Sequence, residues 1–292
     1  MRLASVRSIV LVPALAVTIL SSAPFALAQN SESDWQKEYP LSGSAALTIE
    51  TSDSSLNVQS CGDCKTIQIK VHSGRKLSDF RLEEHQDNNH VYFTLKEKPH
   101  KGLEVHWKAN EGTKVSVETP ASLELDARTA DGNLSVRNLT GNTQVHTADG
   151  ALTLEDLHGD VRLTASDGNI NVHNVTGTLD ARGSDGSMKI DGQFTAVQLH
   201  TSDGKLDFSL APGSQLTSAS HIESSDGHVS IRVPQSFAAD LDVSTSDGHI
   251  DCTLPLTMDH YSGGHHLHGR LNSGGTPLSI RTSDGNVSIT AL

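Results

Sequence analysis

Three sets of residues in this sequence have types and spacings that could do chemistry: a close pair of cysteines, a histidine-rich segment and a repeated Asp-Gly corner. Cys61 and Cys64 have the spacing of a redox pair, of half a zinc site or of a small structural disulfide. A second such pair at zinc spacing is missing, and no βαβ pattern surrounds the cysteines. We therefore expect a structural disulfide, and we expect Cys252 to be a buried, inert thiol.

The histidine-rich segment is the second candidate. It contains His260, His265, His266 and His268, within a Gly-rich stretch at 259–276. Imidazole nitrogens are common ligands of transition metals, and a flexible loop would let several converge on one ion. Solvated histidines in a surface loop have the same sequence pattern. The segment is thus predicted to be a loop, with metal binding as one of its two interpretations.

The third candidate is an Asp-Gly pair preceded by Ser or Ala, which occurs eight times, and a ninth copy has Ser in place of Gly. The copies are Asp53-Ser54, Asp131-Gly132, Asp149-Gly150, Asp167-Gly168, Asp185-Gly186, Asp203-Gly204, Asp226-Gly227, Asp247-Gly248 and Asp284-Gly285. Calcium prefers six to eight oxygen ligands, and each copy offers one carboxylate and a single Gly. We expect these Asp residues to accept hydrogen bonds from turn amides and the protein to need no calcium or other cofactor.

The residues around these pairs show which elements must position them. Around Asp167, the apolar residues Val161 and Leu163 come before and Ile170 and Val172 after, with polar residues between. The four equivalent positions are apolar in 34 of 36 cases over the nine copies. Strict alternation on both sides of a glycine predicts two half-buried strands that meet at a corner.

A second corner follows at Gly141, Gly159 and Gly177, again 18 residues apart. One strand–corner–strand unit cannot bury its own apolar side, whereas stacked copies share a continuous core. Antiparallel hairpins could also use Asp-Gly turns, but they give no reason for a constant spacing. We therefore predict an all-β, single-stranded parallel β-solenoid with about 18 residues per rung. Its inner columns would be Leu134, Leu152, Ile170, Met188 and Leu206, and Val136, Leu154, Val172, Ile190 and Phe208.

The N-terminus has the pattern of a secretory signal peptide. Arg2 and Arg7 precede an apolar stretch at 9–20, and Ala26-Leu27-Ala28 offers a cleavage site. The stretch is shorter than the ~20 residues needed to span a bilayer, so we expect no transmembrane anchor in the mature chain. The predicted organisation is a signal peptide at 1–28, a lead-in at 29–46, an N-terminal β segment that caps the solenoid at 47–122, and regular repeats at 123–292.

Charge and composition limit the partners. The chain has 22 Lys and Arg against 35 Asp and Glu, a formal net charge of −13, and two of the arginines lie in the signal peptide. Such a surface repels phosphate backbones, so nucleic acid is not expected as a partner. Aromatic residues make up only 4% of the chain, which argues against an aromatic platform for sugars.

One segment resembles a known family. Residues 118–136, Glu-Thr-Pro-Ala-Ser-Leu-Glu-Leu-Asp-Ala-Arg-Thr-Ala-Asp-Gly-Asn-Leu-Ser-Val, are similar to the beginning of the β-strand-repeat domain of bacterial "putative adhesins", the domain-of-unknown-function 4097 family. A similar phrase recurs at 233–248, and the resemblance covers 47–292. The resemblance implies that the chain folds as a right-handed β-helix and that it belongs to an exported, adhesin-like family. It carries no catalytic motif.

These observations predict a non-catalytic, exported, adhesin-like β-solenoid with a structural or binding role at the cell envelope. Its expected location is the periplasm, the cell surface or the medium, and its expected ligand is a glycan or a protein. The alternatives are a β-helix enzyme acting on polysaccharides and a metal-binding or envelope-stress accessory protein. The outward positions vary freely among Asp, Arg, Gln, Thr and His without a recognisable catalytic set, so no catalytic residue is predicted.

Overall fold

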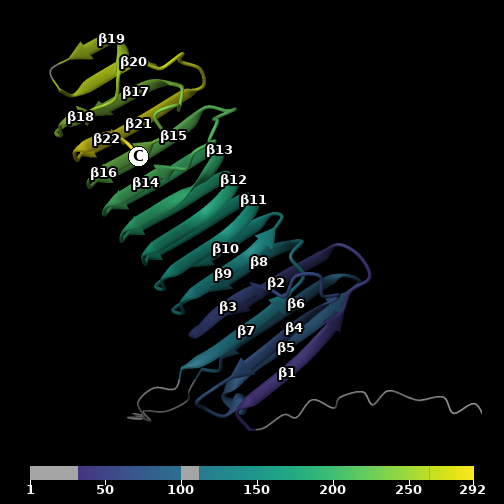
Figure 1. The fold of residues 1–292 in the computed structure, drawn as a ribbon. Helices are drawn as coiled ribbons and strands as arrows, with labels where there is room; N and C mark the ends of the chain where they lie inside the picture. The colour runs from purple at the N-terminus through teal and green to yellow at the C-terminus, as the bar shows by residue number, and fades with distance from the viewer. Residues whose placement is uncertain (1–31, 100–111, 263) are drawn as a thin grey trace, which may run out of the picture.

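The computed structural model describes residues 32–99, 112–262 and 264–292, and for 259–262 it describes the backbone alone. The predicted signal peptide lies outside these residues. The described chain is an elongated stack of β-strands, with one short 3-10 turn, η1 (Leu77–Asp79), and no α-helix in this part (Figure 1). Within the same ranges, no helix is long and apolar enough to cross a membrane.

The strands of the stack have the following bounds. They are β1 Asp34–Pro40, β2 Ala45–Thr51, β3 Ser54–Ser60, β4 Thr66–His72, β5 Phe80–Asp87, β6 His90–Glu97, β7 Thr113–Thr119, β8 Leu123–Thr129, β9 Leu134–Thr140, β10 Thr143–Thr147, β11 Leu152–Asp167, β12 Ile170–Asp185, β13 Met188–Asp203, β14 Leu206–Leu210, β15 Ser220–Asp226, β16 Val229–Val233, β17 Ala239–Thr245, β18 Ile250–Cys252, β19 Leu256–Ser262, β20 His266–Leu271, β21 Pro277–Asp284 and β22 Val287–Ala291. The long strands β11, β12 and β13 each continue through the second corner of a rung.

Two parallel ladders run along the stack, one on each side of the Asp-Gly corners. The first ladder contains the strands that precede the corners, in the order β6, β2, β8, β10, then the later halves of β11, β12 and β13, then β15, β21 and β17. The second ladder contains the strands that follow the corners, from β7 and β3 to β22 and β18. Leu152 pairs with Ile170 in parallel, so the predicted stacking is confirmed and the hairpin alternative is wrong.

The core consists of the predicted inner columns. Leu134, Leu152, Ile170, Met188 and Leu206 pair in register from rung to rung, and none is more than 2% exposed. The second predicted column, from Val136 to Phe208, is equally buried. Burying one such side chain stabilises a fold by roughly 1.5–3 kcal/mol, so the stack is held mainly by these columns.

The Asp-Gly corners need glycine because the rungs stack backbone on backbone there. A Cβ built on Gly150 would collide with the carbonyl oxygen of Gly132, and one on Gly168 with that of Gly150. The same collision recurs at Gly186, Gly204, Gly227, Gly285 and Gly248. Ser54 stands at the N-terminal end of this column. It pairs with Thr113 of β7, and no Asp-Gly pair precedes β7 in the sequence. A side chain is therefore tolerated at this one corner.

The second corner uses residues that the sequence pattern did not single out. Asn138, Asp156 and Asn174 occupy equivalent places in successive rungs and have φ of 58°, 55° and 52°. Asn and Asp adopt this left-handed conformation more readily than other residues with a side chain. In the next rung the register shifts, and Gly192 pairs with Val175. The turn is thus built from a column of Asn and Asp beside the predicted glycines.

The rungs at both ends of the stack are not arranged in sequence order. Ile280 of β21 pairs with Ile222 of β15 on one side and with Val243 of β17 on the other. The last rung of the chain is therefore inserted between two earlier rungs, and the C-terminus lies beside the stack instead of at its tip (Figure 1). At the other end, β2 lies between β6 and β8 in the same way.

Antiparallel strands close both ends of the stack. The segment expected to be a loop at 259–276 instead contains β20 and the end of β19, which pair with each other, and β20 also pairs with β17. At the N-terminal end, β5 pairs with β6, and β4 with β7 and β1. Antiparallel hairpins cover the strand edges that an open parallel stack would expose.

Candidate functional site

A groove of about 540 Å³ opens on the outward face of the first ladder. It crosses β6, β2, β8, β10, β11 and β12, so its long direction follows the axis of the stack. Successive side chains of a strand point to opposite faces, so alternate residues of each strand line it. Its first row is Ala46, Glu124, Asn142, Asp160 and Thr178, and its second row is Thr48, Asp126, Gln144, Arg162 and Asp180. We call this hollow the ladder groove.

Several polar groups of the ladder groove are held by neighbours. Asp126 accepts two hydrogen bonds from the guanidinium of Arg128, at 3.0 and 2.9 Å. Oδ2 of Asp180 lies 3.5 Å from Arg162 Nε and 3.4 Å from an Arg182 nitrogen. The hydroxyl of Thr178 donates to Asp160 at 2.6 Å. These contacts fix the carboxylates on a rigid ladder and offset part of their charge.

Other groups in the ladder groove are available to a ligand. Glu124, Asn142 and Gln144 are exposed, and their side chains make no hydrogen bond or ion pair with the described residues. The Oδ1 atom of Asp180 is buried and has no hydrogen-bond partner among these residues. A buried acceptor without a donor is unusual in proteins, but this oxygen has almost no surface that a ligand could contact, so the groups open to a ligand are Glu124, Asn142 and Gln144.

The N-terminal end of the ladder groove carries a stack of three rings. Tyr92 stacks on His90, with 3.9 Å between ring centroids, and on His85, with 4.4 Å. His90 lines the groove, and its Nε2 lies 2.9 Å from the hydroxyl of Thr48. The low aromatic content had argued against an aromatic platform. The platform was missed because two of its rings are histidines and the pairing of β5 with β6 brings His85 into place.

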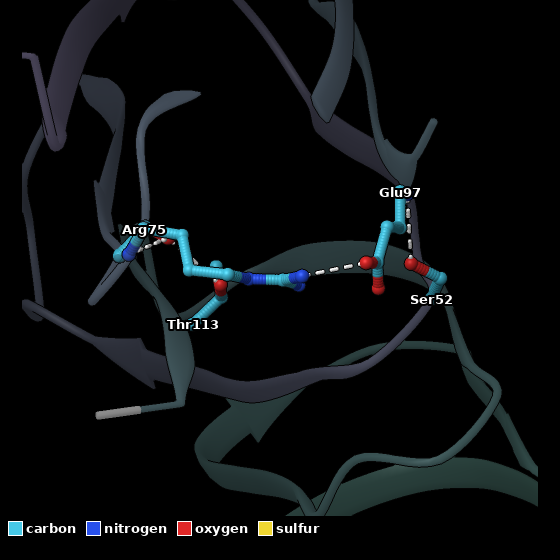
Figure 2. Close-up of polar contacts among 5 residues, drawn as sticks. Ser52, Arg75, Glu97 and Thr113 are labelled. Atoms are coloured by element: carbon cyan, nitrogen blue, oxygen red, sulfur yellow. Dashed lines mark hydrogen bonds and ion pairs between the residues drawn. The ribbon is translucent and has the colours of Figure 1, made fainter. Parts of the chain in front are cut away.

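A second polar cluster joins the N-terminal strands to the first corner (Figure 2). Arg75 forms an ion pair of 2.6 Å with Glu97, and the backbone amide of Glu97 donates to the hydroxyl of Ser52 at 3.1 Å. Partial burial, together with hydrogen bonds and repulsion from Glu97 and Asp131, raises the pKa of Asp53 to about 6. The pKa of Arg75 is raised mainly by its hydrogen bond with Glu97. These contacts form a structural junction, which connects Arg75 and Glu97 of the N-terminal segment to Ser52 and Asp53 at the first corner.

The corner Asp residues do not act as the sequence suggested. Asp167, Asp185 and Asp203 lie in register, and all nine corner Asp side chains are exposed. In the described part of the chain, no backbone amide donates to their carboxylates. The hydrogen-bonding role falls to the neighbouring Asn residues instead. The side-chain oxygens of Asn133, Asn169 and Asn286 accept from the amides of Ala151, Ser187 and His249 on the next rung.

The candidate metal ligands are only partly brought together. His266 Nε2 lies 2.9 Å from Asp242 Oδ1, and His268 Nδ1 lies 3.9 Å from the same oxygen. His265 is exposed, and the backbone of His260 pairs with His268 while its side chain lies outside the described residues. No group of three or more His, Cys, Asp or Glu residues among those described is placed to hold a metal ion.

The cysteines have two different environments. Cys61 and Cys64 form a disulfide in the turn between β3 and β4, with 5.9 Å between their Cα atoms. Cys252 is half-buried at the end of β18, less enclosed than its inward position suggested. Burial raises the pKa of its thiol, which keeps the sulfur in its less reactive protonated form.

The fold and site define a class of all-β repeat protein with two parallel ladders and no recognisable catalytic set among the described residues. The sequence model of the Toastrack DUF4097 family matches residues 44–290, and the chain therefore belongs to this family. The resemblance found in the sequence is thus confirmed. No curated protein matches the chain.

Three solved structures are similar to this chain over most of both lengths. A "putative lipid binding protein" from Parabacteroides distasonis ATCC 8503 has 13% identity and a TM-score of 0.45, over 89% of this chain and 97% of that one. A "putative adhesin" from Bacteroides fragilis NCTC 9343 has 12% identity and a TM-score of 0.38, over 90% and 98%. A "putative cell adhesion protein" from Clostridium sporogenes ATCC 15579 has 8% identity and a TM-score of 0.29, over 88% and 99%.

Proposed function

We propose that this protein is a non-catalytic, exported binding protein of the cell envelope, and that the ladder groove is its contact surface. The observation that carries the proposal is the groove itself, where unpartnered polar side chains are presented by strands in a rigid, fully paired ladder. Binding sites combine a hollow with a few fixed polar groups, and sites on strands hold their geometry better than sites on loops.

Binding is favoured over catalysis because the carboxylates of the ladder groove are occupied. Cleavage of a glycosidic bond needs two carboxyl groups with different roles on either side of the bond. Here Asp126 is paired with Arg128, Asp180 with Arg162 and Arg182, and Asp160 holds a threonine hydroxyl. Only Glu124 is left without such a partner among the described residues.

The finer features of the fold and its location are part of the proposal. We take the coil to be right-handed, with 18 residues in each central rung, a spacing supported by contacts such as that between Asn174 and Asp156. We take the leader to be cleaved after Ala28 and the mature chain to act in the periplasm or at the cell surface. Mass measurement of the exported protein tests the cleavage, and fractionation of the producing cells tests the location.

The contact surface is tested by filling the groove. The double variant Asn142→Arg with Gln144→Arg places two long side chains in it, and Asn171→Arg places one such side chain on the second ladder as a control. We expect the double variant to reduce capture of the mature protein by bacterial envelope fractions by about tenfold, as loss of central contacts does in other interfaces. Equal capture of both variants and the parent protein would refute the proposal.

A further inference from the structure

We infer that the ladder groove binds an extended, uncharged glycan chain. The inference rests on the proposed function and names the class of ligand that the groove accepts. It combines the direction of the groove, the free polar groups in it, the balance of its charges and the ring stack at its end.

The direction of the ladder groove sets the shape of the ligand. Strands in a ladder are about 4.8 Å apart, and the groove crosses them one after another. A ligand lying along it therefore meets a new pair of outward side chains at each strand, from Ala46 and Thr48 on β2 to Thr178 and Asp180 on β12. A polymer of short, similar units can meet such a row repeatedly, whereas a compact molecule would use only one or two strands.

The free groups of the ladder groove are suited to hydroxyl groups. Asn142 and Gln144 each offer two N–H donors and a carbonyl acceptor, and Glu124 offers two acceptor oxygens. Adjacent hydroxyl groups of a sugar ring donate and accept in the same way. The polar lining also disfavours an apolar chain, because covering these groups without partners would cost free energy.

The charges of the ladder groove favour an uncharged ligand over either kind of ion. A polyanion would place its charges against Glu124 and Asp160, which form no ion pair with an arginine among the described residues. A polycation would have to compete with arginines for Asp126 and Asp180. An uncharged chain of hydroxyl groups meets neither cost.

The ring stack gives the ladder groove an end that differs from the rest. His90 lines the groove at β6, and Tyr92 and His85 continue the stack away from it. Ring faces are apolar while ring nitrogens and hydroxyls are polar, so such a stack can contact both the C–H face and the hydroxyl groups of a sugar. We assign this end to the terminal sugar units of the chain.

The test is calorimetric titration of the mature protein with defined hexasaccharides. The uncharged probes are the hexamers of β-1,4-glucose, β-1,4-xylose, β-1,3-glucose, β-1,4-mannose and N-acetylglucosamine, and the charged probes are hexamers of galacturonate and of glucosamine. We expect at least one uncharged hexamer to bind with little dependence on salt, since no ion pairs are formed. Asn142→Ala with Gln144→Ala should weaken it about tenfold, and Asn171→Ala should leave it unchanged.

Failure of the inference and failure of the proposed function give different results. If envelope capture depends on the ladder groove but no uncharged hexamer binds, or a charged one binds more tightly, the ligand class is wrong and the function stands. If capture does not depend on the groove, both are wrong. The variant Ala46→Leu fills the groove from β2 without removing a polar group, and its thermal melting shows whether loss of binding reflects loss of folding. Binding that survives Ala46→Leu in the folded protein would also overturn the inference.

Discussion

The central rungs and the two ends of this molecule have similar repeat sequences, but their strands stack in different orders. From β9 to β14 the strands stack in sequence order, and equivalent residues such as Leu152 and Ile170 meet directly. At the ends, rungs are inserted out of order and antiparallel strands close the stack. This difference shows that the repeat sequence determines how one rung pairs with the next. It does not determine which strands close the ends of the stack.

The two regions are also held together differently. The centre depends on buried columns and corner glycines. The N-terminal end adds ion pairs such as Lys37 with Glu84 and Arg75 with Glu97, and a tilted ring contact between Trp35 and Phe93 with 5.4 Å between centroids. These ion pairs are partly exposed, and such pairs contribute only about 0–1 kcal/mol each. We therefore expect changes in the centre to cost more than changes at the ends.

The largest effect is expected from a charge in the centre of the core. Ile170→Asp places an unpaired carboxylate in a fully enclosed column, and it should lower the free energy of unfolding by several kcal/mol. Asn171→Asp introduces the same group one residue away, on the outward face, and should change stability little. Urea unfolding of both variants measures the difference, and similar midpoints would show that the column is not buried.

A smaller effect is expected at the corners, and it separates centre from end. Gly168→Ala brings a Cβ against the carbonyl of Gly150, and it should cost about 2 kcal/mol or more because backbone atoms must move apart. Ser54→Gly, at the corner where a side chain is tolerated, should cost less than about 1 kcal/mol. Thermal melting compares the two. Equal losses would contradict backbone stacking at the corners.

The junction at the N-terminal end predicts a pH effect. The pKa of Asp53 is raised to about 6, above its value of about 3.9 in an unfolded chain. Its contribution to stability is therefore full below about pH 4 and is lost as the pH rises through about 6. The Asp53→Asn variant lacks this ionisation, so its free energy of unfolding should rise relative to that of the parent protein as the pH increases from 5 to 8. Asp149→Asn is the control away from Glu97, and the same pH trend in both would contradict this assignment.

The smallest effect, none, is expected from calcium. Each rung contributes one exposed corner carboxylate, and the corners are held by backbone stacking at the glycines and by the side chains of Asn133, Asn169 and Asn286. Melting of the mature protein in excess chelator and in millimolar calcium should give the same midpoint. A large increase with calcium would mean that the Asp column binds the ion and supports the fold.

The central rungs could be predicted from the sequence because their information is local. Alternation around Asp167 defines the buried faces, and the 18-residue spacing defines the neighbours. The position of the last rung could not be predicted, because the alternation around Ile280 is the same whichever rungs it joins. The hairpin at 256–271 was missed because its glycines suggested a loop, although His266, Leu267 and His268 alternate as a strand does.

The candidate site was less accessible to sequence reasoning than the fold. The outward residues vary from rung to rung, so Asn142 and Gln144 looked like ordinary solvent-facing positions. The ladder groove depends on the pairing of β2 with both β6 and β8, which are distant in sequence. One signal was present: Ala46 and Thr48 are small residues at outward positions, where a strand face often carries longer side chains.

The most direct test of the stack's order is a choice between two disulfide cross-links. In the structure Asp226 pairs with Asp284, whereas Asp247 lies one rung further on. Cysteines at neighbouring rungs are within reach of a disulfide, and cysteines two rungs apart are not. With Cys252 replaced by Ser, Asp226→Cys with Asp284→Cys should cross-link under mild oxidation, and Asp226→Cys with Asp247→Cys should not. The opposite result would mean that the rungs stack in sequence order and would contradict the inserted last rung.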